Sequence, residues 1–375
     1  MKKSVDSILD GHKIHLHPEK SAIWREIKDC YPIHIEIGAT NKCNHDCVFC
    51  ALDFAIGKTD INRDVMINAL KDMAEPKEKC ELIIKYQGRS AVYNDRVNSV
   101  MFGGEGEPTM HKDLGLFIQK AKEYGLDVAL TTNGTRFDKT LQEQCLPYLS
   151  WVKFSVDAGT PETYKKVHRV SEKQFEILMK NISDSVQLKK QKGLDATIGT
   201  QFLITSMNAN ETEATILIER LREINPDYLS VKPYSDHPRS QKNLEVDSES
   251  YDKLEKTFND LRGKVDFNIE FRRATIERIQ EGNTYSECYG LPFISLIDSK
   301  GNVLPCNLFY DIEKFIYGNL YENSFSEIWG GNKRKEVLSR LKGKELGDCR
   351  RGCRCDAGNR YLNRLKNPQI HDNFT

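Results

Sequence analysis

The sequence lacks the features that mark membrane-spanning, exported and nucleic-acid-binding proteins. Its 375 residues contain no apolar run of the roughly 18 residues that a membrane-spanning helix requires. The N-terminus begins with basic residues, but no apolar stretch follows them, so a secretory signal peptide is not expected. The 55 basic residues balance the 55 acidic residues, and this favours neither nucleic acid nor a membrane surface as a partner. We therefore predict a cytoplasmic protein.

Cysteine, in contrast, is plentiful. The chain has 11 cysteines, and without an export signal they are expected to be reduced thiols that serve metal binding or catalysis. Three of them lie in the segment Cys43-Asn-His-Asp-Cys47-Val-Phe-Cys50. Three thiolates so close together can hold one metal cluster and leave one coordination position open. Soft thiolates select zinc, copper(I) or iron–sulfur clusters. A zinc site is the alternative, with His45 or His34 as its fourth ligand.

A second set of cysteines lies near the C-terminus. Cys288 and Cys306 bracket a predicted β-hairpin that turns at 300–302, and a hairpin returns its two ends to one place. Cys349, Cys353 and Cys355 form a tight loop that could complete the same site. The set fits either a structural zinc ion or a second iron–sulfur cluster. Four thiolates fill a cluster, so one thiol of the five could be spare and could donate a hydrogen atom to a carbon radical.

The middle of the chain alternates short apolar runs with helical patterns, which is typical of βαβ units and a parallel sheet. Six strands are predicted, at 33–37, 99–102, 127–131, 151–156, 196–204 and 228–231. Predicted helices occupy 63–74, 114–124, 139–145, 161–167, 173–191 and 211–224. Six units are too few for a closed eight-stranded barrel. We predict an α/β fold with a partial (β/α)6 barrel and ligands at the carboxyl ends of the strands.

The pattern also predicts a domain organisation. Residues 1–32 form an N-terminal extension, and residues 33–235 form the partial barrel. Residues 236–284 form a helical linker region, which begins with a polar loop and contains a helix at about 247–263. Residues 285–375 form a small cysteine-rich domain of short β pieces.

The cysteine motif resembles that of the radical S-adenosylmethionine (radical SAM) superfamily over about residues 33–235. Its C-x3-C-x-aromatic-C pattern is matched by Cys43, Cys47, Phe49 and Cys50. The resemblance implies that the three thiolates hold a [4Fe–4S] cluster whose open iron binds SAM. It further implies reductive cleavage of SAM to a 5′-deoxyadenosyl radical that abstracts hydrogen from a substrate. The electron would come from a donor such as flavodoxin or ferredoxin.

The same resemblance implies further SAM-binding residues. The segment 103–108 looks like the family's glycine-rich motif, and its candidates are Gly104, Glu105, Gly106 and Glu107. A nucleotide-phosphate loop is not expected there, because the Lys-Ser/Thr of a P-loop is missing. The remaining candidates match the turn after the third strand, the end of the fourth strand and the adenine neighbour, and they are Asn133, Ser155, Asp157 and Phe49.

The segment Cys288-x12-Gly301-x4-Cys306 resembles the opening of the SPASM and twitch domains that follow many radical SAM cores. This chain has fewer C-terminal cysteines than the two-cluster SPASM domain, so we expect one auxiliary [4Fe–4S] cluster. Which of Cys349, Cys353 and Cys355 bind it stays open.

The substrate is the least determined part. We expect a small polar metabolite, such as a sugar, an aminocyclitol or a nucleotide-linked compound, that undergoes dehydrogenation or epimerisation. Maturation of a ribosomally made peptide by crosslinking or epimerisation is the first alternative, and the short segment before the first strand leaves no room for a leader-binding module there. A non-catalytic metal-binding scaffold is the second. Candidate substrate-binding residues are Gln201, Lys232, Tyr234 and Arg169.

Overall fold

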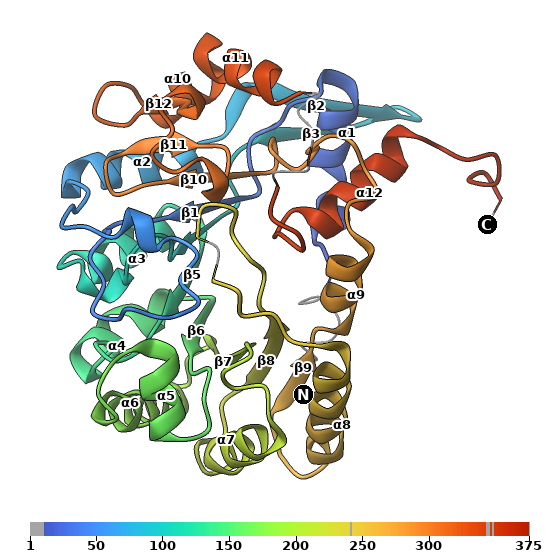
Figure 1. The fold of residues 1–375 in the computed structure, drawn as a ribbon. Coiled ribbons are helices and arrows are strands. Elements are labelled where there is room, and N and C mark those ends of the chain that lie inside the picture. The colour runs from blue at the N-terminus through green and yellow to red at the C-terminus, as the bar shows by residue number, and fades with distance from the viewer. Residues whose placement is uncertain (1–10, 241, 343–345, 347–348, 375) are drawn as a thin grey trace.

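The protein is built around one open, twisted sheet (Figure 1). The computed structural model describes residues 11–240, 242–342, 346 and 349–374. The sheet has ten strands in the order β12-β11-β10-β1-β4-β5-β6-β7-β8-β9. Its six central strands run parallel and are β1 (His34–Ile37), β4 (Ser99–Phe102), β5 (Asp127–Thr132), β6 (Trp151–Ser155), β7 (Thr197–Ile204) and β8 (Tyr228–Pro233).

These six strands are those predicted from the sequence. Among the described strands, no pairing joins the two ends of the sheet, so the partial barrel is confirmed. The connecting helices are α2 (Arg63–Ala74), α3 (Leu114–Glu123), α4 (Lys139–Cys145), α5 (Pro161–His168), α6 (Lys173–Lys192) and α7 (Glu211–Ile224). Each agrees with a predicted helix to within one residue at either end. In Figure 1 they pack along one face of the sheet.

Alternation along the strands assigns each side chain to one of two faces. In β6, Val152 and Phe154 are fully buried and join the main hydrophobic core with residues of the helices. Trp151, Lys153 and Ser155 alternate with them and are only half-buried. We call the face that carries these three residues the inner face. It is the face where a partial barrel holds its ligands.

The C-terminal region extends the same sheet. Strand β10 (Ile294–Ile297) pairs in parallel with β1, and β11 (Asn302–Leu304) pairs antiparallel with β10. The predicted hairpin between them is confirmed, and it turns at Gly301, whose φ of 79° is in the left-handed region that favours glycine. Strand β12 (Gly318–Asn319) completes this edge. Helices α10 (Phe325–Gly330), α11 (Asn332–Leu341) and α12 (Asp356–Lys366) follow.

Several elements were not predicted from the sequence. Strand β9 (Asn268–Phe271) lies within the expected helical linker region, between α8 (Ser248–Arg262) and α9 (Arg273–Glu281), and it adds a parallel strand beside β8. Helix α1 (Pro18–Ile27) precedes the sheet. Strands β2 (Lys77–Tyr86) and β3 (Arg89–Asp95) form a separate hairpin between α2 and β4. The domain boundaries given above remain predictions, because β9 and β10 both continue the sheet.

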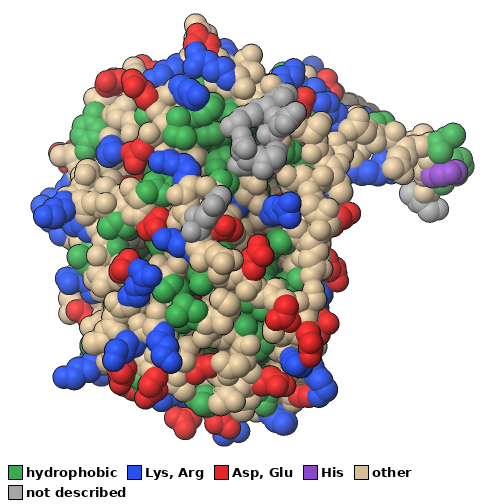
Figure 2. Space-filling model, in the orientation of Figure 1, with side chains coloured by type: hydrophobic (Ala, Val, Ile, Leu, Met, Phe, Trp, Pro, Cys, Tyr) green, Lys and Arg blue, Asp and Glu red, His purple; other side chains and the backbone are tan. Residues whose placement is uncertain are grey.

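The face of the molecule that Figure 2 shows carries both signs of charge. In Figure 2, Lys and Arg side chains are interspersed with Asp and Glu over the visible face. Among the helices that the structure describes, none has both the length and the apolar character needed to cross a lipid bilayer.

Candidate functional site

The three motif cysteines lie on the loop that leaves the carboxyl end of β1. We call residues 38–52 the cluster loop. Its backbone is fixed at several points, including hydrogen bonds from Asp46 N to His168 O (3.3 Å) and from Val48 N to Val167 O (2.9 Å). Cys50 N also donates to Cys47 O (3.1 Å). The end of helix α5 therefore holds the middle of the motif in place.

The three thiols are half-buried and near one another. Burial raises the pKa of Cys43 to about 11, raises that of Cys47 well above its usual range, and raises that of Cys50. The charges of Cys43 and Cys50 both act on Cys47. Such thiols become thiolates when a metal replaces their protons, so the donor set fits the cluster that the motif implies.

The three thiols do not by themselves form a closed single-ion site. Around one zinc ion, Zn–S bonds of about 2.3 Å bring the sulfurs to about 3.8 Å from one another. Among the described residues, Cys43, Cys47 and Cys50 do not form a group whose ligand atoms all lie within 4.8 Å. A cubane cluster holds its thiolates farther apart. His34, one alternative fourth ligand, instead has its Nδ1 3.1 Å from Ser99 Oγ on the inner face.

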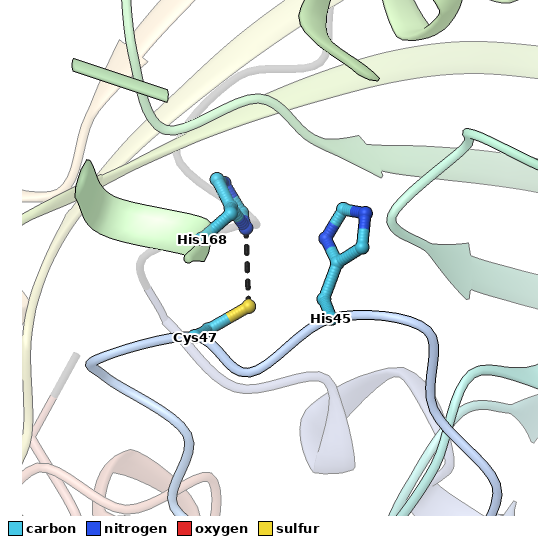
Figure 3. Close-up of side chains that lie close together, drawn as sticks. All are labelled: His45, Cys47 and His168. Atoms are coloured by element: carbon cyan, nitrogen blue, oxygen red, sulfur yellow. Dashed lines mark hydrogen bonds between the residues drawn. The ribbon is translucent and has the colours of Figure 1, made fainter. Parts of the chain in front are cut away.

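Two histidines border Cys47, as Figure 3 shows. The ligand atoms of His45, Cys47 and His168 lie within 4.8 Å of one another. Nε2 of His168 faces the carbonyl oxygen of Val156 at 3.3 Å, so it carries a proton, and Nδ1 accepts from Cys47 Sγ at 3.1 Å. Burial lowers the pKa of His168 to about 3 and that of His45 to about 4, so both rings are neutral. Sequence reasoning missed His168, which is 121 positions from Cys47.

The glycine-rich segment 103–108 packs directly against the cluster loop. A Cβ on Gly106 would lie 2.5 Å from both Thr40 O and Lys42 O, and one on Gly104 would lie 3.2 Å from Gly38 Cα. Gly104 also has a φ of 97°. Only glycine permits this approach of two backbones. The segment therefore fixes the position of the backbone that leads into the three cysteines.

The two glutamates of this segment have different partners. Glu107 is buried and accepts hydrogen bonds from Thr132 Oγ1 (2.6 Å), Asn133 N (2.7 Å) and both the amide and the hydroxyl of Thr109. Glu105 accepts from Ser299 N (2.6 Å) in the β10–β11 turn, and burial raises its pKa to about 7. Both carboxyl groups thus already have protein partners, and their contact with SAM stays a prediction.

Asn133 ties the turn after β5 to the cluster loop. Its Nδ2 donates to Asn44 Oδ1 at 2.8 Å, and its Oδ1 accepts from Thr135 N at 3.1 Å. Asn44 in turn donates to Thr135 Oγ1 at 2.9 Å. Because Asn44 directly follows Cys43, this network positions the first motif cysteine.

Asp157 lies just beyond the end of β6 in the left-handed region, with φ 56°. Its Oδ1 accepts from Leu203 N at 2.7 Å, whereas its Oδ2 is buried without a hydrogen bond and lies 3.6 Å from His168 Nε2. Burial raises its pKa to about 7. Ser155 is half-buried on the inner face, and its register partner Gln201 is buried beside it.

The other predicted residues lie in different surroundings. Phe49 packs edge-on to His168, with ring centroids 5.3 Å apart. Tyr234 is buried and donates to Asp236 (2.7 Å), and Lys232 is half-buried at the end of β8. Arg169, in contrast, ends α5 and makes an exposed ion pair with Asp46 (3.2 Å). The roles proposed for these residues are not tested by their positions.

The five C-terminal cysteines gather in one group, which we call the auxiliary group. Cys288 lies before β10, Cys306 lies after β11, and the other three lie on the loop that leads into α12. Thiols of Cys349 and Cys355 donate to Cys353 and hold its pKa well below the usual range. Cys355 also donates to Cys288 and lowers its pKa, while burial raises that of Cys306, on which the charges of Cys288 and Cys353 act.

Neighbouring residues hold the auxiliary group together. Asn359 on α12 donates to Cys288 Sγ (3.5 Å) and accepts from Gly290 N (2.7 Å). A Cβ on Gly290 would lie 3.2 Å from Cys355 Sγ. Five soft thiols in one group, of which Cys355 is buried and the other four are half-buried, fit an iron–sulfur cluster with one thiol in excess. Sequence reasoning missed Arg354, between Cys353 and Cys355, which pairs with Glu36 Oε2 on β1 at 2.6 Å.

The fold and the two thiol groups thus define an α/β iron–sulfur protein with one three-thiol site and one auxiliary site. Comparison with known families agrees. A model of the radical SAM superfamily matches residues 37–200, and a model of SPASM, an iron–sulfur cluster-binding domain, matches residues 288–356. The chain belongs to the radical SAM superfamily and carries a C-terminal SPASM domain. Its cofactors are accordingly a [4Fe–4S] cluster, SAM and auxiliary iron–sulfur clusters.

Individual relatives are distant. The chain is 23% identical over 254 residues to a protein named GTPase Obg from Brachyspira hyodysenteriae, covering 67% of this chain and 34% of that one. It is 24% identical to an S-adenosylmethionine-dependent nucleotide dehydratase from Selenomonas ruminantium, covering 51% and 62%. The chain thus spans less than two thirds of either relative. The SAM-bound crystal structure of Streptococcus suis SuiB has a similar fold, with TM-score 0.63, 17% identity and coverage of 95% and 79%.

Proposed function

We propose that this radical SAM enzyme removes a hydrogen atom from a small polar metabolite and so achieves dehydrogenation or epimerisation. The substrate class is a sugar, an aminocyclitol or a nucleotide-linked compound. When bound, the cluster and SAM supply a radical strong enough to abstract hydrogen from carbon, which polar side chains cannot do. A flavodoxin or ferredoxin is the proposed electron donor.

One contact carries this proposal. Arg354 extends from the auxiliary group to Glu36, which is on the inner face of β1 and one residue before the strand ends. The cluster loop leaves that same strand end. Both thiol groups are therefore connected to the carboxyl end of β1, and substrates bind at the carboxyl ends of the strands in barrel enzymes. A metabolite bound there would have the radical source on one side and an electron acceptor on the other.

The protein side chains have distinct parts in this scheme. The glycine segment and the Asn133 network fix the cluster loop, and Asp157, Ser155 and Gln201 line the adjoining strand ends. His168, the last residue of α5, is buried, and its Nδ1 contacts Cys47 Sγ, so a neutral ring and not water lies beside that thiol. Exclusion of water protects a reactive radical from side reactions. The auxiliary group would take one electron from the substrate radical when the net reaction is an oxidation.

Anaerobic reconstitution tests the proposal. The holoenzyme is mixed with SAM, a chemical reductant and a panel of deuterated sugars, aminocyclitols and nucleotide-linked metabolites. We expect deuterium to appear in 5′-deoxyadenosine with at least one member. A product that has lost a hydrogen pair indicates dehydrogenation, and one that has gained a solvent hydrogen indicates epimerisation. A fully loaded protein that cleaves no SAM contradicts the proposal.

Peptide maturation is the second candidate, because the fold similarity extends to SuiB crystallised with its precursor peptide SuiA, at TM-score 0.63 and 17% identity. We rank it second because a fold this distantly related does not carry substrate specificity. Deuterium transfer from a labelled peptide, with none from any metabolite, would reverse this ranking.

A further inference from the structure

Two lysines face the same side of the sheet near the site. Lys153 is at the centre of β6 and shares the inner face with Ser155. Ser155 pairs in register with Gln201, and Leu203, two residues further along β7, pairs with Lys232 on β8. Paired residues of parallel strands point to the same face, so both lysines belong to the inner face. Both are half-buried.

Within the described part of the chain, neither ammonium group has a hydrogen bond or an ion pair. The ring of Trp151 lies beside Lys153, with its centroid 6.0 Å from Nζ. Most other inward-facing charges have partners of their own. Arg354 is paired with Glu36, and Asp157 accepts a hydrogen bond from Leu203 N.

The surroundings of both lysines disfavour their charged form. Burial, with the charges of Arg272 and Arg354, lowers the pKa of Lys153 to about 8, although Asp157 and Glu36 act in the opposite direction. Burial lowers the pKa of Lys232 well below its usual range, and the charge of Lys153 is the next largest cause. Arg272 and Arg350 add to that effect. Placing cations together away from water is costly unless an anion compensates them.

We propose that Lys153 and Lys232 bind the phosphate group of a small-molecule substrate. The proposal rests on the proposed function and names its substrate class more closely. A phosphate ester carries a charge of about −1.5 to −2 at neutral pH, which matches two ammonium groups, whereas a carboxylate matches one. Lysine binds phosphate as a point charge and needs no planar geometry. The anion would lie on the inner face, between β6 and β8.

The first test measures binding without turnover. Inorganic phosphate is titrated calorimetrically and anaerobically into SAM-loaded holoenzyme, with acetate as the carboxylate probe. Variants Lys153→Met and Lys232→Met keep the apolar stem and remove the charge, and Lys153→Arg restores it. Lys256→Met is the matched control, because Lys256 is exposed on α8 and pairs only with Asp260 (2.7 Å). If a Met variant does not fold, the Gln variant replaces it.

We expect each Met variant to weaken phosphate binding about tenfold, the loss typical of one charge-assisted contact, while Lys153→Arg and Lys256→Met bind like the wild type. Acetate should bind more weakly than phosphate. Equal phosphate affinity in all variants overturns the proposal. So does a loss of SAM affinity as large as the loss of phosphate affinity, because the lysines would then serve the methionine carboxylate.

A second test separates this inference from the proposed function. Phosphorylated metabolites and their dephosphorylated counterparts are compared for deuterium transfer into 5′-deoxyadenosine, and only the phosphorylated members should transfer. Transfer from neutral metabolites alone overturns the phosphate site and leaves the proposed function intact. Transfer from an acidic peptide alone overturns both. A wild-type protein without SAM cleavage sinks the proposed function, whereas the phosphate titration still decides the site.

Discussion

The cluster loop and the auxiliary group both offer thiolates to a metal cluster. They differ in how the chain supplies the thiols and in the charges that surround them. The cluster loop supplies three thiols from one short segment, and its neighbours are neutral imidazoles and backbone. The auxiliary group supplies five thiols from three segments, with Arg350 and Arg354 between them. Nearby cations favour the reduced, more negative cluster, because net charge is one of the determinants of its potential. Three thiolates leave one coordination position open at the first site, whereas the cations beside the second site would favour the reduced form of a cluster bound there.

The most direct test of this difference is the Cys43→Ala variant. We expect it to abolish SAM cleavage and to remove about four of the roughly eight iron atoms per chain that two cubane clusters would hold. The auxiliary iron should remain. Iron analysis and quantification of 5′-deoxyadenosine check both statements. The control is Cys145→Ala, at a buried thiol outside both groups. Retained 5′-deoxyadenosine formation in the Cys43 variant would contradict the assignment of the first site.

The reciprocal change is the double variant Cys288→Ala with Cys306→Ala, which removes two of the five auxiliary thiols, one more than the group has in excess. We expect the loss of about four iron atoms, this time from the second site, and the loss of product formation. SAM cleavage without substrate should persist, because all three thiols of the cluster loop are intact. If SAM cleavage disappears together with the auxiliary iron, the two sites are not independent and the comparison fails.

Gly106→Ala perturbs the first site without removing a ligand. The new methyl group would lie 2.5 Å from two carbonyl oxygens of the cluster loop, so the loop must move. We expect several-fold less SAM cleavage and reduced iron occupancy at the first site, whereas auxiliary iron is unchanged. Gly263→Ala is the control, since a Cβ there meets no atom within 4 Å. Wild-type cleavage by the Gly106 variant would show that the packing of the two backbones is not required.

The smallest expected effect concerns Glu105, which connects the glycine segment to the hairpin that leads to Cys306. Its pKa is raised from 4.5 to about 7, so the folded state binds its proton more tightly than the unfolded state. Its contribution to stability is complete below pH 4.5 and is lost as the pH rises to about 7. When the pH rises from 5 to 8, the wild type should therefore lose up to about 3 kcal/mol of unfolding free energy that the Glu105→Gln variant keeps.

Urea unfolding of the cluster-free protein at both pH values checks this prediction. Asp157, whose pKa is raised in the same direction, gives both proteins a common remaining pH dependence. Parallel losses of stability in the wild type and the variant would show that Glu105 is not a buried, protonated link between the two regions.

Much of the fold was predictable because its signals are local. The six central strands and the helices between them appear in the sequence as apolar runs and amphipathic patterns bounded by turn residues. Strand β9 was missed because its pairing with β8 holds it in place, and the local sequence pattern does not record that contact. The β2–β3 hairpin was missed because it lies apart from the alternating units.

The candidate site, too, has parts that the sequence predicted and parts that it did not. The cysteine spacing and the glycine segment were readable from the sequence. The His168 contact with Cys47 was not, because the end of α5 brings together residues 121 positions apart. Lys153 gave one usable signal, a charged residue on the inner face of a strand whose other face is buried. That signal becomes meaningful only when its neighbours across the sheet are known.

The sequence by itself determined the chemistry of the two metal sites, since ligand type and close spacing depend on neighbouring residues in the chain. Only the tertiary structure decided which charges face one another. Arg354 reaches Glu36, and Lys153 acts on Lys232, because strand register and the docking of the C-terminal loop bring them together. Coulomb forces depend on distance through space, and no sequence pattern records that distance.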